Sequence, residues 1–91
     1  MEDFLLSIVV PVYNRPDEIE ELLASLVGQK PFCYEVIIVE DGSAIPCKEV
    51  VERYEGAFPV QYIVIPNGGP SNARNVGSSQ AQGRYLVILD S

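Results

Sequence analysis

Four short runs of apolar residues, rich in β-branched side chains, recur along the sequence and are separated by more polar stretches. They cover Leu5–Tyr13, Glu35–Glu40, Val60–Ile65 and Tyr85–Leu89. Nearly continuous apolar runs of this length are typical of strands buried on both faces of a parallel sheet. The third run contains the polar Gln61, so we expect that strand to lie nearer an edge, and we expect the fourth strand to be buried.

Between these runs the apolar residues recur with helical spacing. Three amphipathic faces result: Ile19, Leu22, Leu23, Leu26 and Val27; Cys47, Val50, Val51 and Tyr54; and Ala73, Val76, Gly77 and Ala81. Pro16, followed by Asp17 and Glu18, suits the start of the first helix. The small residues of the third face would allow a close approach to a sheet. The order β-α-β-α-β-α-β predicts an α/β, Rossmann-like fold, with a parallel sheet and helices on both faces.

The overall charge and hydropathy narrow the classes of partner. The chain has 91 residues, enough for one small domain or for part of a larger one, and a net charge of −7. This charge argues against nucleic acid and against an anionic membrane surface as partners, because both require a basic patch. No apolar run approaches the ~20 residues that span a bilayer. We therefore expect a cytoplasmic location, with membrane association of the full-length protein left open.

The two cysteines, Cys33 and Cys47, stand among apolar residues without CxxC spacing, and the chain contains no histidine. This pattern argues against a zinc site. We expect two reduced, buried thiols in preference to a disulfide.

Polar and turn-forming residues lie at the end of each predicted strand. The sets are Pro11, Tyr13 and Asn14; Glu40, Asp41, Gly42 and Ser43; Pro66, Asn67 and Gly68; and Asp90. Each of these residues alone also suits an ordinary turn. In open parallel sheets, however, ligands bind beyond the carboxyl ends of the strands. The four sets are therefore expected to meet at one site.

The sequence lacks the glycine-rich loops that hold phosphates, because neither GxGxxG after the first strand nor GxxxxGK(S/T) occurs. A nucleotide site without such a loop generally balances the diphosphate charge with a metal ion. Asp90, at the end of the fourth strand, could supply a ligand, since Mg²⁺ and Mn²⁺ prefer oxygen donors.

Four segments of the sequence form an ordered set of motifs. They are Ser7–Asn14 (SIVVPVYN), Val36–Ser43 (VIIVEDGS), Asn67–Gly77 (NGGPSNARNVG) and Gly83–Ser91 (GRYLVILDS). Each segment alone is weak evidence, but the ordered set spans nearly the whole chain and resembles the family 2 glycosyltransferases. The chain departs from the family pattern in having Glu40 where Asp is commoner. The second Asp of the family's Asp-x-Asp motif would lie beyond Ser91.

The resemblance implies a GT-A fold, of which residues 1–91 would be the N-terminal nucleotide-binding part, incomplete at the C-terminus. It implies binding of a nucleotide diphosphate sugar, usually UDP-linked, with Mg²⁺ or Mn²⁺. The sugar would pass with inversion to a saccharide, lipid-linked or other hydroxyl acceptor, as in polysaccharide biosynthesis. The first strand would be central, flanked by the second and the fourth, with the third beyond the second. We expect the catalytic base outside the chain, so the fragment would bind nucleotide only.

Mapped onto this sequence, the resemblance places Pro11, Tyr13 and Asn14 in the nucleoside pocket. Tyr13 could pack under the nucleobase or simply fill the edge of the sheet, and we favour stacking. Asp41 would accept a hydrogen bond from the base, and Arg74 would lie near the pyrophosphate. We expect Asp41→Ala to weaken nucleotide binding with little change in stability, because the residue would lie at the edge of the sheet.

Two further acids, Glu40 and Asp90, belong to the predicted nucleotide site. Asp90 would be the first carboxylate of the Asp-x-Asp motif, facing the ribose and the metal ion. Glu40 would be either a partner behind the nucleotide-binding residues or an ordinary surface acid, and the sequence does not decide between these roles.

Two other classes of protein stay open at this point. A nucleotidyltransferase-like α/β enzyme usually carries a glycine-rich, basic loop after its first strand, and a phosphoacceptor receiver module has an acidic pair there. This chain has Tyr13 and Asn14 at that position. The sequence ends just after its last predicted strand, so we also expect exposed sheet edges through which the fragment self-associates.

Overall fold

The computed structural model describes residues 5–27 and 34–89. Its four strands form one parallel sheet in the order β3-β2-β1-β4. They are β1 (Leu6–Val12), β2 (Tyr34–Asp41), β3 (Val60–Ile65) and β4 (Tyr85–Ile88). This order confirms the predicted arrangement, including the position of the third strand at an edge.

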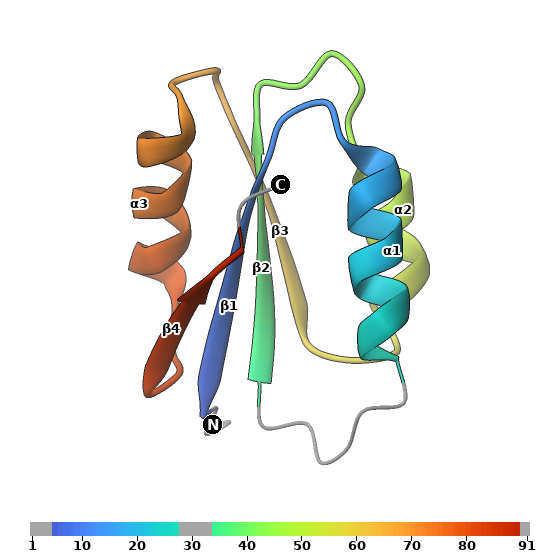
Figure 1. The fold of residues 1–91 in the computed structure, drawn as a ribbon, viewed down its shortest axis with the longest axis vertical. Coiled ribbons are helices and arrows are strands. Elements are labelled where there is room, and N and C mark those ends of the chain that lie inside the picture. Colours follow the sequence, from blue (N-terminus) through green and yellow to red (C-terminus); the bar gives the residue numbers. More distant parts are fainter. Residues whose placement is uncertain (1–4, 28–33, 90–91) are drawn as a thin grey trace.

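Three helices connect the strands and cover both faces of the sheet. They are α1 (Pro16–Leu26), α2 (Lys48–Tyr54) and α3 (Pro70–Gln80). α1 and α2 lie on one face and α3 lies on the other (Figure 1). The predicted α/β fold with helices on both faces is therefore confirmed. No helix within the described residues has the length and apolar character needed to cross a membrane.

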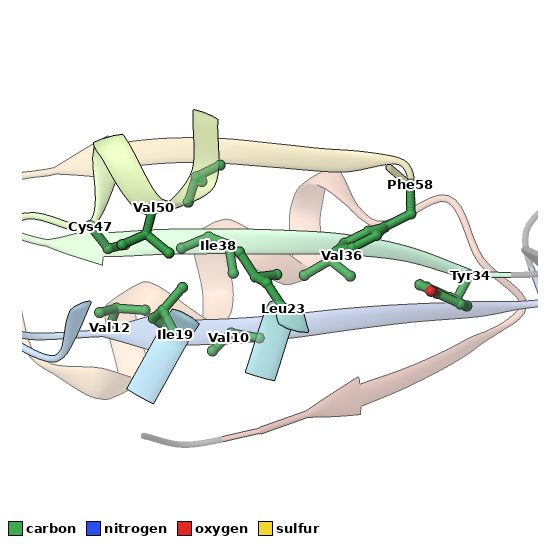
Figure 2. Packing of buried hydrophobic residues seen from close by; sticks show 11 residues of the cluster. Val10, Val12, Ile19, Leu23, Tyr34, Val36, Ile38, Cys47, Val50 and Phe58 are labelled. Atoms are coloured by element: carbon green, nitrogen blue, oxygen red, sulfur yellow. The ribbon is translucent and has the colours of Figure 1, made fainter. Parts of the chain in front are cut away.

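The core has two parts because successive side chains of a strand point to opposite faces of the sheet. In β2, Val36 and Ile38 face α1 and α2, whereas Ile37 and Val39 face α3. All four side chains are fully buried, as the apolar sequence of this strand predicts. The larger part of the core, below α1 and α2, includes four further residues drawn in Figure 2: Val10, Val12, Ile19 and Leu23.

α3 lies close to the sheet through its small residues. Ala73 and Gly77 are buried, and a β-carbon placed on Gly77 would lie 2.4 Å from Val9 Cγ1 and 3.1 Å from Val39 Cγ2. A side chain at this position would therefore displace the valines of β1 and β2. The prediction that the third helix approaches the sheet through small residues is confirmed.

Two predictions from the sequence differ from the structure. The fourth strand is not buried, since Tyr85 is 64% and Leu86 47% exposed. The reason is its position, because within the described part of the chain β4 pairs with β1 alone, at an edge of the sheet. Val27 does not extend the apolar face of α1, because the helix ends at Leu26 and Val27 is extended and exposed.

A buried polar cluster that sequence reasoning missed joins the amino ends of β1 and β2 to the segment after α3. The Ser7 hydroxyl donates to Glu35 Oε2 (2.6 Å) and accepts a hydrogen bond from Gly83 N–H (2.7 Å). Gln82 N–H donates to the same carboxylate oxygen (2.6 Å). These bonds satisfy a carboxylate that is buried at the end of the sheet opposite the predicted site.

Candidate functional site

The carboxyl ends of β1, β2 and β3 lie level at one edge of the sheet, called the carboxyl edge below. Val12, the last residue of β1, lies opposite Glu40, and Asp41, the last residue of β2, lies opposite Ile65 at the end of β3. The segments that follow these strands are joined by hydrogen bonds. The predicted convergence is therefore confirmed for these three strand ends.

Asp41 lies on the face of the sheet that α3 covers, and it joins β2 to the turn before α3. Its Oδ1 accepts a hydrogen bond from Gly68 N–H (2.9 Å), and its carbonyl oxygen accepts one from Asn67 Nδ2 (3.2 Å). The residue is only 5% exposed. Asp41 thus lies at the carboxyl edge, as predicted, but it is buried there and holds the neighbouring turn, which the sequence did not indicate.

Gly42 is required directly after Asp41. Its φ of 65° lies in the left-handed region, and a β-carbon would lie 2.6 Å from the backbone nitrogen of Asn67. Glycine combines this backbone conformation with so close an approach without strain. The Asp-Gly pair of the sequence therefore brings the end of β2 against the turn that contains Asn67 and Gly68.

Glu40 lies on the opposite face, the one that α1 and α2 cover, and is 1% exposed. Its Oε1 accepts hydrogen bonds from Cys47 N–H (2.7 Å) and from the Tyr62 hydroxyl (2.8 Å), and its Oε2 accepts one from the Ser43 hydroxyl. Burial, and after it the nearby Glu40 carboxylate, raises the pKa of Cys47 to about 12 and also raises the pKa of Tyr62. Glu40 is therefore a buried partner behind the carboxyl edge, and the alternative of a surface acid is wrong.

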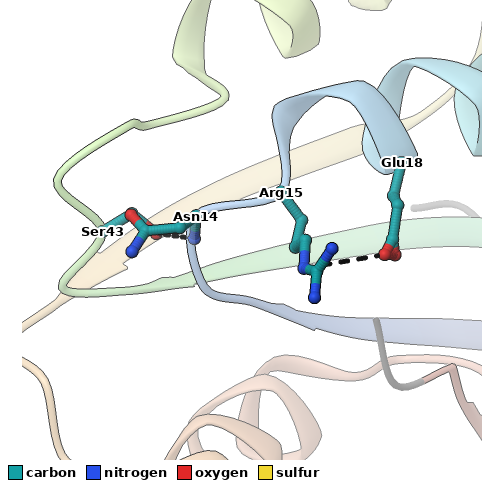
Figure 3. A network of polar contacts seen from close by, with 4 residues as sticks. All are labelled: Asn14, Arg15, Glu18 and Ser43. Carbon is teal, nitrogen blue, oxygen red and sulfur yellow. Dashed lines mark hydrogen bonds and ion pairs between the residues drawn. The ribbon is translucent and has the colours of Figure 1, made fainter.

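Asn14 connects the loop after β1 to the loop after β2. Its φ of 55° is left-handed, a conformation that Asn adopts more readily than most residues. Its backbone N–H donates to Ser43 Oγ (2.8 Å; Figure 3), and its Oδ1 accepts a hydrogen bond from Ile45 N–H (3.0 Å). The adjacent ion pair of Arg15 with Glu18 (3.8 Å) is exposed, and such pairs contribute little to stability.

Three other predicted site residues occupy different environments. Tyr13, next to Asn14, is 52% exposed, so its ring is accessible for stacking. Pro11 is buried within β1, opposite Val39, one residue before the strand ends. Arg74 is half-buried in the second turn of α3. Of these three, only Tyr13 presents a large exposed surface at the carboxyl edge.

The predicted metal ligand, Asp90, lies outside the described residues. Within residues 5–27 and 34–89, no three His, Cys, Asp or Glu side chains come together in a way that could hold a metal ion. Glu40 and Asp41 lie on opposite faces of the sheet, and each accepts hydrogen bonds from protein donors. The described residues therefore do not form a Mg²⁺ or Mn²⁺ site by themselves.

Two residues that join the loops, Ser43 and Gly68, were predicted to lie at the strand ends, but no contact was predicted for either. Both belong to the strand-end motifs, and this is the signal that could have singled them out. Their partners are distant in sequence: Ser43 lies 29 positions from Asn14, and Gly68 lies 27 positions from Asp41. Sequence reasoning without the register of the strands could not pair them.

Comparison with known proteins finds similar glycosyltransferases. The chain is 42% identical over 87 residues to an uncharacterized glycosyltransferase of Haemophilus influenzae, covering 94% of this chain and 29% of that protein. It is 36% identical over 89 residues to the poly(ribitol-phosphate) beta-N-acetylglucosaminyltransferase TarS of Staphylococcus aureus, covering 93% of this chain and 16% of that protein. The chain thus spans less than a third of the length of either relative.

Solved structures agree with these relatives. The crystal structure of S. aureus TarS 1-349 in complex with UDP-GlcNAc is similar with a TM-score of 0.84 and 34% identity, over 93% of this chain and 26% of that chain. The complex of the same protein with UDP has a TM-score of 0.78 and 26% identity, over 94% of this chain and 27% of that chain. The parallel sheet with its three helices is therefore the GT-A arrangement that the resemblance implied. Because the family model "Glycosyl transferase family 2" matches residues 7–91, the chain belongs to glycosyl transferase family 2.

Proposed function

We propose that the protein transfers a sugar from a UDP-linked donor to an acceptor hydroxyl, and that this chain supplies the part that binds the nucleotide. The observation that carries the proposal is the joining of three strand ends at the carboxyl edge, through Asn14 with Ser43 and Asp41 with Gly68. Open parallel sheets bind their ligands at such an edge. Family membership and the likeness to TarS with UDP-GlcNAc support a nucleotide sugar as the ligand.

The chemistry of the edge suits a nucleoside diphosphate. A nucleobase requires a flat surface for stacking, which we assign to the exposed ring of Tyr13. It also requires an acceptor for its N–H group, which we assign to Asp41. The pyrophosphate requires positive charge, which we assign to Arg74 in α3, because a guanidinium binds phosphate with two parallel N–H groups. Asn14 would complete the nucleoside pocket beside Tyr13.

The proposed transfer is inverting. A general base removes the proton of the acceptor hydroxyl, which attacks the anomeric carbon while the nucleoside diphosphate departs from the opposite face. We assign this catalytic base neither to Glu40, which protein donors surround, nor to Asp41, which we assign to the nucleobase. A bound Mg²⁺ or Mn²⁺ would balance the charge of the diphosphate, and Asp90 is the residue of this chain that the family resemblance assigns to it. The acceptor would be a saccharide, a lipid-linked or another hydroxyl compound.

Binding of UDP, GDP and UDP-GlcNAc to the full-length protein, measured by isothermal titration calorimetry with and without Mn²⁺, tests the proposal. We expect the two uridine nucleotides to bind more tightly than GDP and Mn²⁺ to strengthen their binding. Failure of all three nucleotides to bind under both conditions would contradict a nucleotide-sugar site. The anomeric configuration of the product, determined by NMR, tests inversion separately.

A further inference from the structure

Ser43 is placed between the two loops that would hold the nucleoside. We propose that Ser43 is a positioning residue of the nucleotide site: its hydroxyl, oriented by Glu40, holds the left-handed Asn14 and thereby places Tyr13 where the base binds. The inference rests on the proposed function, because it assigns the role in nucleotide binding of a residue that itself lies behind the binding surface.

The direction of the hydrogen bonds around Ser43 follows from their chemistry. The backbone N–H of Asn14 can only donate, so Ser43 Oγ accepts that bond (2.8 Å). The single hydroxyl proton of Ser43 is then directed to Glu40 Oε2. Hydrogen bonds to an ionised acceptor are stronger than neutral ones. The carboxylate therefore fixes the rotation of the hydroxyl and leaves its lone pair aimed at Asn14.

Glu40 is itself held in place by other elements. Its second oxygen accepts hydrogen bonds from Cys47 N–H, at the start of α2, and from the Tyr62 hydroxyl, on β3. The carboxylate is 1% exposed, so water does not compete for these donors. Positions supported by secondary-structure elements are more precise than positions supported by loops alone. Through Glu40 and Ser43, the loop after β1 is thus held in a fixed position relative to β2, β3 and α2.

The residue that Ser43 holds has an uncommon backbone conformation. Asn14 has a φ of 55°, and two hydrogen bonds maintain it, from its N–H to Ser43 and from Ile45 N–H to its Oδ1. Tyr13 precedes Asn14 directly and is 52% exposed. Because the two residues share a peptide plane, loss of the bond to Ser43 would release the orientation of Tyr13.

The chain contains a matched control at the other end of β2. The Ser7 hydroxyl donates to the buried Glu35 carboxylate (2.6 Å) and accepts a hydrogen bond from a backbone N–H, that of Gly83 (2.7 Å). Ser43 makes the same two kinds of contact with Glu40 and Asn14. At ~3.3 Å per residue along a strand, the α-carbons of Glu35 and Glu40 lie about 16 Å apart along β2. A purely structural role would make the two serines equivalent.

The test compares Ser43→Ala with Ser7→Ala in the full-length protein, by the Kd for UDP and by the melting temperature. We expect both changes to lower the melting temperature, and only Ser43→Ala to weaken UDP binding, by about tenfold, the effect of losing one well-placed hydrogen bond. Ser43→Thr, which keeps the hydroxyl, should restore most of the affinity. Equal effects of Ser43→Ala and Ser7→Ala on the Kd would overturn the inference alone. Absence of UDP binding by the unaltered protein would overturn the proposed function and the inference with it.

A second pair of variants tests the same inference if Ser43→Ala does not fold. Asn14→Gly and Asn14→Ala both remove the side-chain amide, but only glycine adopts the left-handed conformation without strain. We expect Asn14→Gly to bind UDP several-fold more tightly than Asn14→Ala. Equal or reversed affinities would show that the backbone conformation at this position has no part in binding.

Discussion

Glu40 and Asp41 are consecutive residues of β2, yet their carboxylates lie on opposite faces of the sheet and bind different parts of the chain. Glu40 accepts hydrogen bonds from Cys47 and Tyr62 on the face of α1 and α2, whereas Asp41 accepts one from Gly68 on the face of α3. Although Glu40 and Asp41 are adjacent in the sequence, their carboxylates therefore do not lie together in the structure. Both carboxylates hold neighbouring segments, and we assign only Asp41 to the nucleobase.

Asp41→Ala is expected to weaken UDP binding by about 1–3 kcal/mol, because the N–H group of the uracil would lose its hydrogen-bond acceptor. Contrary to the prediction from sequence, we also expect a lower melting temperature, since Asp41 is buried and its loss leaves Gly68 N–H without this acceptor. Asp41→Asn keeps an acceptor oxygen for Gly68 and should be destabilised less. Calorimetric titration and thermal unfolding give the two quantities, and an unchanged Kd for Asp41→Ala would remove this residue from the site.

Gly77→Ala is expected to destabilise the protein by about 1–3 kcal/mol, as overpacking does in other cores. The added β-carbon would lie 2.4 Å from Val9 Cγ1 and force α3 away from the sheet. In an exposed helix, Gly→Ala raises the free energy of unfolding by up to about 1 kcal/mol. A lower free energy of unfolding in urea would therefore indicate the close contact of Gly77 with β1 and β2. The control is Gly56→Ala, because a β-carbon on Gly56 would meet nothing within 4 Å. Equal stability of the two variants would contradict the close approach.

Cys47 is expected to resist alkylation in the folded protein. It is a buried free thiol, as its apolar surroundings predicted, whereas Cys33 lies outside the described residues. Burial, followed by the contact with Glu40, raises the pKa of Cys47 to about 12. The thiolate is the reactive form, so iodoacetamide at pH 8 should label Cys47 only after unfolding, as read by mass spectrometry.

The same pKa shift predicts how stability depends on pH. Because the pKa of Cys47 is higher in the folded state than its ordinary value of 9.0, the stabilisation is complete below pH 9 and is lost as the pH rises towards 12. Urea unfolding at several alkaline pH values measures this loss, and Cys47→Ala serves as the control. In the alkylation experiment, labelling of Cys47 by iodoacetamide at the same rate with and without urea would contradict its burial.

The 91-residue chain in isolation is expected to self-associate through the edge strand β4. Tyr85 is 64% exposed there, and an uncovered strand edge with apolar side chains invites pairing with another chain. Tyr85→Lys should therefore reduce the sedimentation coefficient at high concentration. Val64→Lys alters an equally exposed residue (65%) on β3, the other edge strand of the described sheet, and shows whether association also uses that edge. A monomer at all concentrations would disprove association.

The sequence by itself determined the order of the elements, the parallel sheet with helices on both faces, and the family. These follow from local patterns: apolar runs long enough for buried strands, helical spacing between them, and four motifs in a fixed order. Residues such as Ile19 and Leu23 were predictable core residues because helical periodicity depends only on neighbours along the chain. The place of the strand-end residues Asn14 and Asp41 was predictable for a different reason, since topology puts every carboxyl end of a parallel sheet at one edge.

Only the tertiary structure decided what the residues at that edge contact. Strand alternation alone puts Glu40 and Asp41 on opposite faces, but folding decided which helices cover each face. Contacts across 29 and 27 positions then joined Asn14 to Ser43 and Asp41 to Gly68. The exposure of β4, expected to be buried, likewise depended on its place at an edge of the sheet. Hydrogen-bond partners and burial are properties of chain segments brought together by folding, and no local pattern of residues specifies them.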